Sequence, residues 1–148
     1  MDEAQLRIFV SNLQNYFERQ TTRAAEVGTP FLGEANALPV FDYTGVIGIS
    51  GARRGCVYFT APGDLLRDLL LRVGESNVAE ANLADLAGEI ANTISGNARR
   101  DFGPDFMISV PVVVRGRTQS IQMPCETKAY VIPLRWQKHR AALVVGVN

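Results

Sequence analysis

The sequence has few of the residues that build metal sites and nucleophilic centres. Its 148 residues include two cysteines, Cys56 and Cys125, and one histidine, His139. The cysteines fall in no CxxC or Cys/His cluster, so we expect buried thiols and not a disulfide framework or a zinc site. A Ser-His pair or a histidine-based metal centre would depend on His139 alone, which lies in a polar QKH turn. We therefore expect no metal site in this chain.

Net charge and long apolar segments are also absent. Fifteen basic and fifteen acidic residues cancel, which leaves no general field to attract nucleic acid or an anionic membrane. No segment approaches the roughly 18 continuous apolar residues of a membrane span. The N-terminus has charges scattered through an apolar pattern, unlike a signal peptide. We expect a cytoplasmic protein that binds neither nucleic acid nor membrane.

The chain does have enough apolar residues, 47% of its length, to build one core. We therefore expect a single domain spanning residues 1–148. Apolar spacings of three and four predict helices, and β-branched or aromatic runs predict strands. The predicted order is a helix from about Leu6 that ends before Gly28, a loop at 29–38, a hairpin of strands 40–50 and 56–61, a helix from Gly63 to Gly74, a helix opened by Asn77 and Glu80 that runs to about Arg100, and strands at 107–114, 120–123, 129–136 and 141–147.

Short polar links between the C-terminal strands indicate antiparallel neighbours, and nothing in the order requires a parallel sheet. The sequence therefore predicts an α+β domain in which helices cover a mostly antiparallel sheet.

The last predicted helix contains an unusual stretch, DLAGEIANTISGNA, at residues 85–98. At about 100° per residue one side is apolar and should face the core; it comprises Leu83, Leu86, Ala87, Ile90 and Ile94. The opposite side should face outward and comprises Asp85, Glu89, Asn92 and Gly96. A flank of small residues (Ala84, Gly88, Ala91 and Ser95) lies beside that stripe and would allow close approach by an internal element or by an outside partner.

A helix surface selected only for stability would not carry these residues. Gly88, Asn92 and Gly96 together give up on the order of 2–3 kcal/mol of helix preference relative to alanine. An exposed carboxylate can hold a cation, and a carboxamide three residues later can orient a water without titrating. Neither Glu89 nor Asn92 is a nucleophile, so the electrophile, and any metal, would have to come from a partner.

At these residues the sequence resembles the CheX branch of the CheC/CheX/FliY family of bacterial chemotaxis phosphatases. The family pattern, D/S-x-x-x-E-x-x-N with a downstream proline, is matched by Asp85, Glu89, Asn92 and Pro111. The runs TGVIGISGARRGCVYFTA and GEIANTISGNA add to the likeness, which covers about residues 40–117. Only one copy of the motif is present, as in CheX. Eighteen residues separate Asn92 from Pro111, which is fewer than in the family pattern.

The resemblance implies hydrolysis of the aspartyl phosphate on a CheY-like response regulator. In that reaction Asn92 would orient the attacking water and Glu89 would pair with the regulator's lysine. Gly88, Gly96 and Pro111 would support the motif, and Asp85 would either help to orient the site or favour solvation of that face. The regulator would supply Mg²⁺, and this chain would bind no cofactor. The resemblance also implies a homodimer joined through the sheets.

Two other functions fit the same residues. A non-catalytic module could use this face to bind a regulator or a flagellar or signalling component. A purely structural dimerisation domain would need neither Glu89 nor Asn92.

Overall fold

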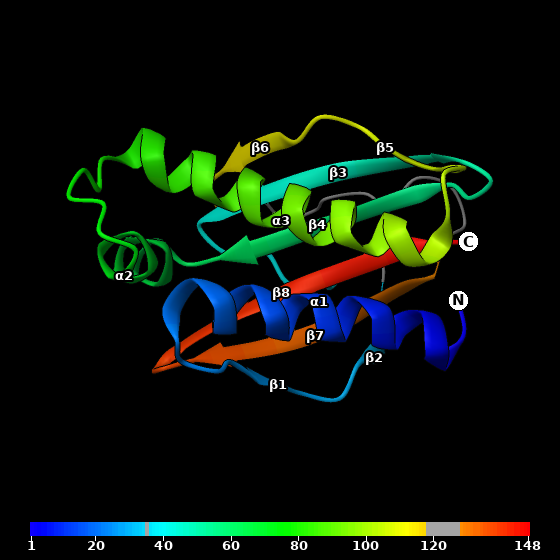
Figure 1. Cartoon of the computed structure of the whole chain (residues 1–148), viewed down its shortest axis with the longest axis horizontal. Coiled ribbons are helices and arrows are strands. Elements are labelled where there is room, and N and C mark those ends of the chain that lie inside the picture. The colour runs from blue at the N-terminus through cyan, green and yellow to red at the C-terminus, as the bar shows by residue number, and fades with distance from the viewer. Residues whose placement is uncertain (35, 118–127) are drawn as a thin grey trace.

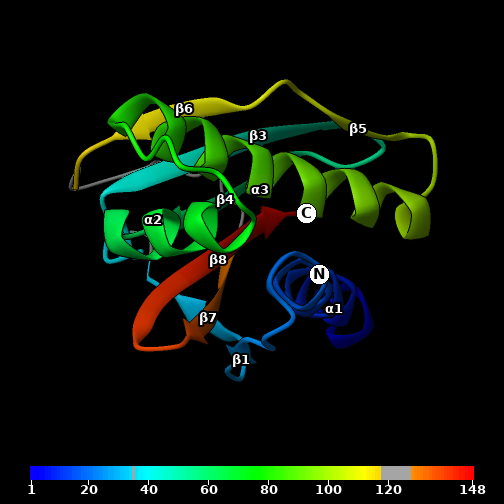
Figure 2. The same cartoon turned by 60° about the vertical axis from the view of Figure 1, so that its left-hand side comes forward.

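The computed structural model describes residues 1–34, 36–117 and 128–148, which form one antiparallel sheet with helices packed on one face (Figure 1; Figure 2). The helices are α1 (Glu3–Thr21), α2 (Gly63–Arg72) and α3 (Glu80–Phe102). The strands are β1 (Glu26–Val27), β2 (Phe31–Gly33), β3 (Tyr43–Gly51), β4 (Gly55–Ala61), β5 (Phe106–Ile108), β6 (Val112–Arg115), β7 (Ala129–Trp136) and β8 (His139–Val147).

The sheet has the strand order β1-β7-β8-β4-β3-β5, with β2 also beside β7 and β6 also beside β3. Every pair of these strands is antiparallel. One edge is therefore made by β5 and β6, and the other by the short strands β1 and β2. The predicted fold class, an α+β domain with a mostly antiparallel sheet under helices, is confirmed.

The two faces of the sheet bury different clusters because successive side chains of a strand point to opposite sides. On β7, Ile132 and Leu134 join the main core beneath the helices. Val131 instead joins a smaller cluster on the other face, with Tyr58 and Val144, where the segment before β3 covers it. The helix-covered face is thus the one that can carry a site built on α3.

The long predicted helices are confirmed. Helix α1 begins at a capping box in which the Asp2 carboxylate accepts from the Gln5 N–H at 2.8 Å and the Gln5 side chain accepts from the Asp2 N–H at 3.0 Å. Its apolar stripe buries Phe9, Leu13 and Phe17. Helices α1 and α3 cross the sheet in opposite directions (Figure 1), and the rings of Phe9 and Phe102 lie 5.8 Å apart between them.

Two local predictions were wrong in the first half of the chain. The predicted loop at 29–38 contains β2, because Phe31–Gly33 pairs with β7. Helix α3 begins at Glu80 after Ala79, which supplies no side-chain cap, so Asn77 is not its N-cap. The Asn77 side chain accepts from the Ala79 N–H at 3.1 Å and forms a turn before the helix.

The C-terminal half differs from the prediction in two further places. The predicted strand at 107–114 is two strands, because residues 109–111 interrupt the pairing with β3. His139 begins β8 and is 7% exposed, whereas the sequence placed it in a polar turn. The predicted strand at 120–123 and Cys125 lie outside the described residues, while Cys56 is buried as expected.

Candidate functional site on helix α3

Helix α3 is held against the sheet over most of its length, which fixes the direction of its outer side chains. The predicted inner residues are all buried: Leu83, Leu86, Ala87, Ile90 and Ile94. The closest approach is to β3, where Gly45 faces the helix backbone. A Cβ atom added to Gly45 would lie 2.7 Å from Gly88 Cα. The close contact of the two backbones fixes the position of α3 on the sheet at this point.

The predicted outer stripe is confirmed as a surface feature. Asp85, Glu89 and Asn92 are exposed, and Gly96 is half-buried. The side chains of Glu89 and Asn92 form no hydrogen bond or ion pair with another described residue. No basic residue occurs in α3 before Arg99, so the charged residues that α3 itself contributes to this stripe are acidic. A carboxylate and a carboxamide are thus presented to an incoming molecule.

The small flank of α3 serves internal packing. Ala84, Gly88, Ala91 and Ser95 are all buried. A Cβ atom at Gly88 would lie 2.9 Å from Val113 Cγ2 and 3.5 Å from Pro111 Cβ. Of the two partners that the sequence left open for this flank, the structure selects an internal one, the segment leading into β6.

Pro111, the proline that the resemblance assigns to the motif, lies beside α3. Pro111 is exposed and lies just before β6, at the level of Gly88. The side chain of Ile108, at the end of β5, lies at the level of Gly96. The β5–β6 segment therefore runs along α3 on the side of Asn92, and Ser109 anchors it by accepting from the Gly48 N–H at 2.8 Å.

On the other side of Glu89 lies a cleft that the sequence did not predict. It has a volume of about 270 Å³ and is formed where α1, α2 and α3 converge. It is lined by Tyr16, Gln20, Leu69, Leu70, Val73, Gly74, Glu75, Leu86 and Glu89. Spacing along the chain could not reveal it, because the three helices meet only after folding.

Tyr16 is the buried polar group of this cleft. The residue is 7% exposed, and its ring packs edge-on against Phe17 at 5.6 Å. Burial, and secondarily the nearby Glu89 carboxylate, raise the pKa of the Tyr16 hydroxyl. The phenol therefore stays neutral and can donate a hydrogen bond beside Glu89.

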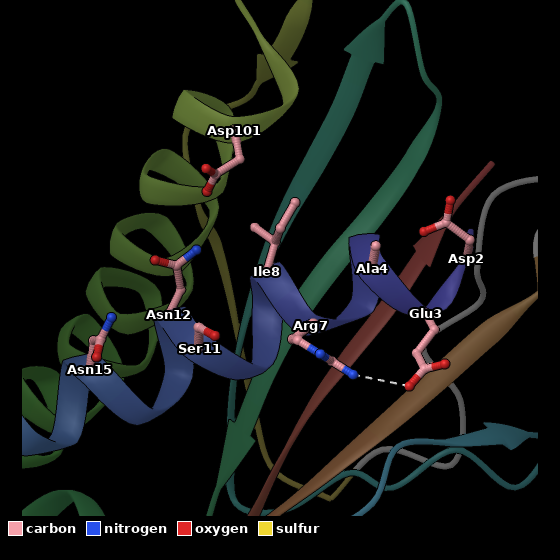
Figure 3. Close-up of a pocket in the computed structure, with 9 residues that line it drawn as sticks. All are labelled: Asp2, Glu3, Ala4, Arg7, Ile8, Ser11, Asn12, Asn15 and Asp101. Carbon is pink, nitrogen blue, oxygen red and sulfur yellow. Dashed lines mark hydrogen bonds and ion pairs between the residues drawn. The ribbon is translucent and has the colours of Figure 1, made fainter.

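A second, larger hollow of about 740 Å³ lies along α1, as Figure 3 shows. Its walls carry short polar side chains, with Asn12 on α1 pointing towards α3 and Asp101 on α3 pointing back (Figure 3). Arg7 and Glu3 form an exposed ion pair across one turn at 3.1 Å. None of the residues that the sequence predicts for the site lines this hollow.

In the described part of the chain, neither His139 nor the residue types that bind metals form an alternative centre. His139 Nε2 lies 2.6 Å from Asp68 Oδ2, which ties β8 to α2 away from the stripe. Within the described parts of the chain, no group of three or more His, Cys, Asp or Glu residues could hold a metal ion. None of the helices described is long and apolar enough to cross a membrane.

Comparisons with known proteins agree with this architecture. The chain resembles a CheC-like superfamily protein from Shewanella sp. PV-4 (22% identity, TM-score 0.86, covering 100% of this chain and 99% of that chain). It also resembles the chemotaxis protein CheX from Vibrio vulnificus (24%, 0.84, covering 98% and 99%). A third structure is the CheX–CheY–BeF₃–Mg²⁺ complex from Borrelia burgdorferi (14%, 0.79, covering 97% of each chain).

No curated protein matches the chain. Residues 43–135, which include β3, α3 and the β5–β6 segment, match the family described as chemotaxis phosphatase CheX. This span is more than half of the chain and contains the whole outer stripe of α3. The protein therefore belongs to the CheX family of chemotaxis phosphatases.

Proposed function

We propose that this protein, acting as one domain over residues 1–148, hydrolyses the aspartyl phosphate of a CheY-like response regulator. Water attacks the phosphorus atom, the bond between phosphorus and the aspartyl oxygen breaks, and a free aspartate and inorganic phosphate result. The observation that carries the proposal is the exposed pair Glu89 and Asn92 on one face of an anchored helix in a CheX-family chain. Asp85, one turn before Glu89, supports that face.

Asn92 orients the attacking water in this proposal. Its carboxamide offers one acceptor and two donors and does not titrate, so it can hold a water over a wide pH range. The Asn92 side chain forms no hydrogen bond with another described residue. It belongs to a helix whose backbone lies in close contact with β3. Fixing a water in line with the phosphorus removes orientational entropy from the reaction.

Glu89 docks the regulator by pairing with its active-site lysine. The outer face of α3 contains acids and no base before Arg99, which suits a cationic group on the partner. The relative from Borrelia burgdorferi was solved with CheY, beryllofluoride and Mg²⁺, which supports a regulator as the partner and as the source of the metal ion. Phosphoryl transfer depends mainly on positioning and charge stabilisation, so this chain can contribute to catalysis through Asn92 while the regulator supplies the metal ion.

The decisive experiment follows phosphate loss from each phosphorylated response regulator of the host, with and without this protein. We expect Asn92→Ala to lower the rate by about 10²-fold while regulator binding is retained. We expect Glu89→Ala to lower both the rate and the affinity. Thr93→Ala, on the adjacent part of the same helix, is the matched control and should act like the wild type. Unchanged phosphate loss for every regulator would contradict the proposal.

The same experiment separates the two alternatives. Stoichiometric regulator binding without turnover would identify a non-catalytic binding module. Full function in cells with both Glu89 and Asn92 replaced by alanine would identify a purely structural domain.

A further inference from the structure

The cleft between α1, α2 and α3 has features of a binding site that the reaction itself does not require. Its floor is apolar, with Leu69, Leu70 and Leu86. Its polar groups are the carboxylates of Glu75 and Glu89, the Gln20 amide and the Tyr16 hydroxyl. No lysine or arginine lines it.

The Tyr16 hydroxyl is the observation that points to a ligand. Tyr16 is more than nine-tenths buried and lines the cleft. Its hydroxyl has no hydrogen-bond partner among the described residues. The hydroxyl oxygen is not one of the fully enclosed polar atoms that lack a partner, so it opens into the cleft and meets solvent there. An incoming side chain that donates a hydrogen bond to the Tyr16 oxygen would replace that solvent.

The size of the cleft indicates what kind of group enters. Its volume of about 270 Å³ is below the roughly 300–1,000 Å³ typical of pockets for whole small-molecule ligands. One long side chain fits this space better than a free metabolite does. An apolar floor with two carboxylates suits a lysine or arginine, whose aliphatic stem can be buried while its charged end is paired.

The position of the cleft separates it from the reacting centre. At about 100° per residue, Asn92 and Leu86 lie about 120° apart around α3, with Glu89 midway between them. Asn92 faces the β5–β6 side of the helix, whereas Leu86 faces the cleft. Glu89 therefore stands at the border between the proposed reaction face and the cleft.

We propose that this cleft receives a second basic side chain of the docked response regulator, held by Tyr16 and Glu75, and that it selects among regulators. This inference rests on the proposed function, because it assumes that a regulator docks at Glu89 and Asn92. It assigns Tyr16 and Glu75 to binding and gives neither a role in hydrolysis. The cleft then discriminates between regulators that share the same phosphorylation site.

The test measures binding of each of the host's response regulators, loaded with beryllofluoride and Mg²⁺, by titration calorimetry, together with turnover of the phosphorylated forms. We expect Tyr16→Phe and Glu75→Gln each to weaken binding of the cognate regulator by about 3- to 10-fold, the loss of one hydrogen bond or ion pair. KM should rise by the same factor while kcat stays unchanged. Thermal melting of both variants should remain within a few degrees of wild type.

Glu18→Gln is the matched control. Glu18 is an exposed acid on the same helix as Tyr16 and does not line the cleft. The Glu18→Gln variant removes the same charge as Glu75→Gln. It should leave binding unchanged if the cleft acts by local contacts and not through the overall electrostatic field of the protein. A further arm replaces the basic surface residues of the regulator one at a time by methionine. One of these replacements should abolish the effect of Glu75→Gln.

The outcomes separate this inference from the proposed function. If both Tyr16→Phe and Glu75→Gln bind with wild-type affinity while Asn92→Ala is inactive, the proposed role of the cleft is wrong and the proposed phosphatase function stands. If both variants bind more weakly and the wild-type protein shows no turnover, the binding role of the cleft is supported and the proposed hydrolysis is wrong. Equal weakening by Glu18→Gln overturns the cleft in favour of a general electrostatic attraction.

Discussion

The glycines of α3 illustrate how one residue type can serve two purposes in one helix. Gly88 is buried, and a Cβ atom there would press against Val113 at 2.9 Å. Gly96 has room, because the nearest atom to an added Cβ is Ile108 Cδ1 at 3.9 Å. An interior glycine costs a helix about 1 kcal/mol relative to alanine. At Gly88 close packing explains that cost, whereas at Gly96 packing against the described residues does not.

Alanine substitutions at these positions should have opposite effects on stability. Gly96→Ala should raise the free energy of unfolding by up to about 1 kcal/mol, since it gains helix preference without a clash. Gly88→Ala should lower it, because overpacking costs about 1–3 kcal/mol and exceeds the gain in preference. Urea denaturation followed by circular dichroism measures both. A stabilised Gly88→Ala variant would show that the flank can yield to a methyl group.

The phosphatase assay gives Gly96→Ala a second use. Gly96 lies one turn after Asn92. Because glycine has no side chain, a partner can approach the helix backbone closely beside the proposed water site. We expect the variant to be more stable and to bind the regulator less tightly, with KM raised several-fold. A variant with unchanged KM would indicate that the partner does not contact α3 at this turn.

At the scale of elements, α2 depends on a cap that comes from outside its own sequence. Pro62 precedes the helix and supplies no side-chain cap. The Asp42 carboxylate, from the segment before β3, accepts from the Gly63 N–H at 2.8 Å and from Arg117 Nε at 3.0 Å. A negative charge at a helix N-terminus is favourable. This bond fixes α2, whose C-terminal end forms one wall of the cleft.

Removing this cap should destabilise the fold in a pH-dependent way. The hydrogen bond from the Gly63 N–H is the largest influence and lowers the pKa of the Asp42 carboxyl; burial opposes it, and the neighbouring Arg117 lowers the pKa further. A carboxyl with a lowered folded-state pKa stabilises the fold above its unfolded pKa of about 3.9, and that contribution is lost as the pH falls through the folded value. Asp42→Ala should cost about 1 kcal/mol at pH 7.

The measurement is urea denaturation of wild type and Asp42→Ala between pH 7 and pH 2.5. The electrostatic part of the stability difference should shrink as the pH falls below about 4. Asp42→Asn, which keeps an oxygen acceptor but no charge, should lie between the two proteins at pH 7. A difference that does not depend on pH would assign the effect to the hydrogen bond alone.

The elements that the sequence predicted well are those whose apolar periodicity and bounding turn residues lie within their own stretch of sequence. Helix α3 has a full apolar stripe, and the β3–β4 hairpin has β-branched strands between glycines. Strand β2 could not be predicted, because its three residues are a strand only through pairing with β7. His139 in a QKH sequence looks solvated, whereas in the fold it is covered by Asp68 from α2 and by the stacked ring of Trp136.

The candidate site also contains some features that could be predicted from local sequence and others that could not. The outer stripe could be predicted because helix spacing alone places Asp85, Glu89 and Asn92 together. The contact of Gly88 with Val113, and the place of Tyr16 beside Glu89, could not, because they join residues far apart in the chain. A tyrosine next to the apolar stripe of α1 looks like any other core residue. The Tyr16 hydroxyl opens into a cleft because α1, α2 and α3 converge around it.

At the scale of the whole molecule, the sheet edge made by β5 and β6 carries apolar side chains at its surface. Val110 is 80% exposed and Val112 is 60% exposed, and Met107 lies on the same edge. An exposed, apolar edge strand is a template for pairing with another chain unless it is covered. We propose that a second copy of the protein covers it, in a homodimer joined through the sheets.

The dimer can be tested by light scattering at micromolar concentration, where we expect twice the mass of one chain. Val112→Lys should shift the protein to a monomer, because it places a charge in the apolar centre of the proposed interface. Leu32→Lys, at the opposite edge of the sheet, is the matched control, since Leu32 is 55% exposed and carries a similar apolar surface. A wild-type monomer would contradict the dimer. Dissociation by Leu32→Lys and not by Val112→Lys would move the interface to the β2 edge.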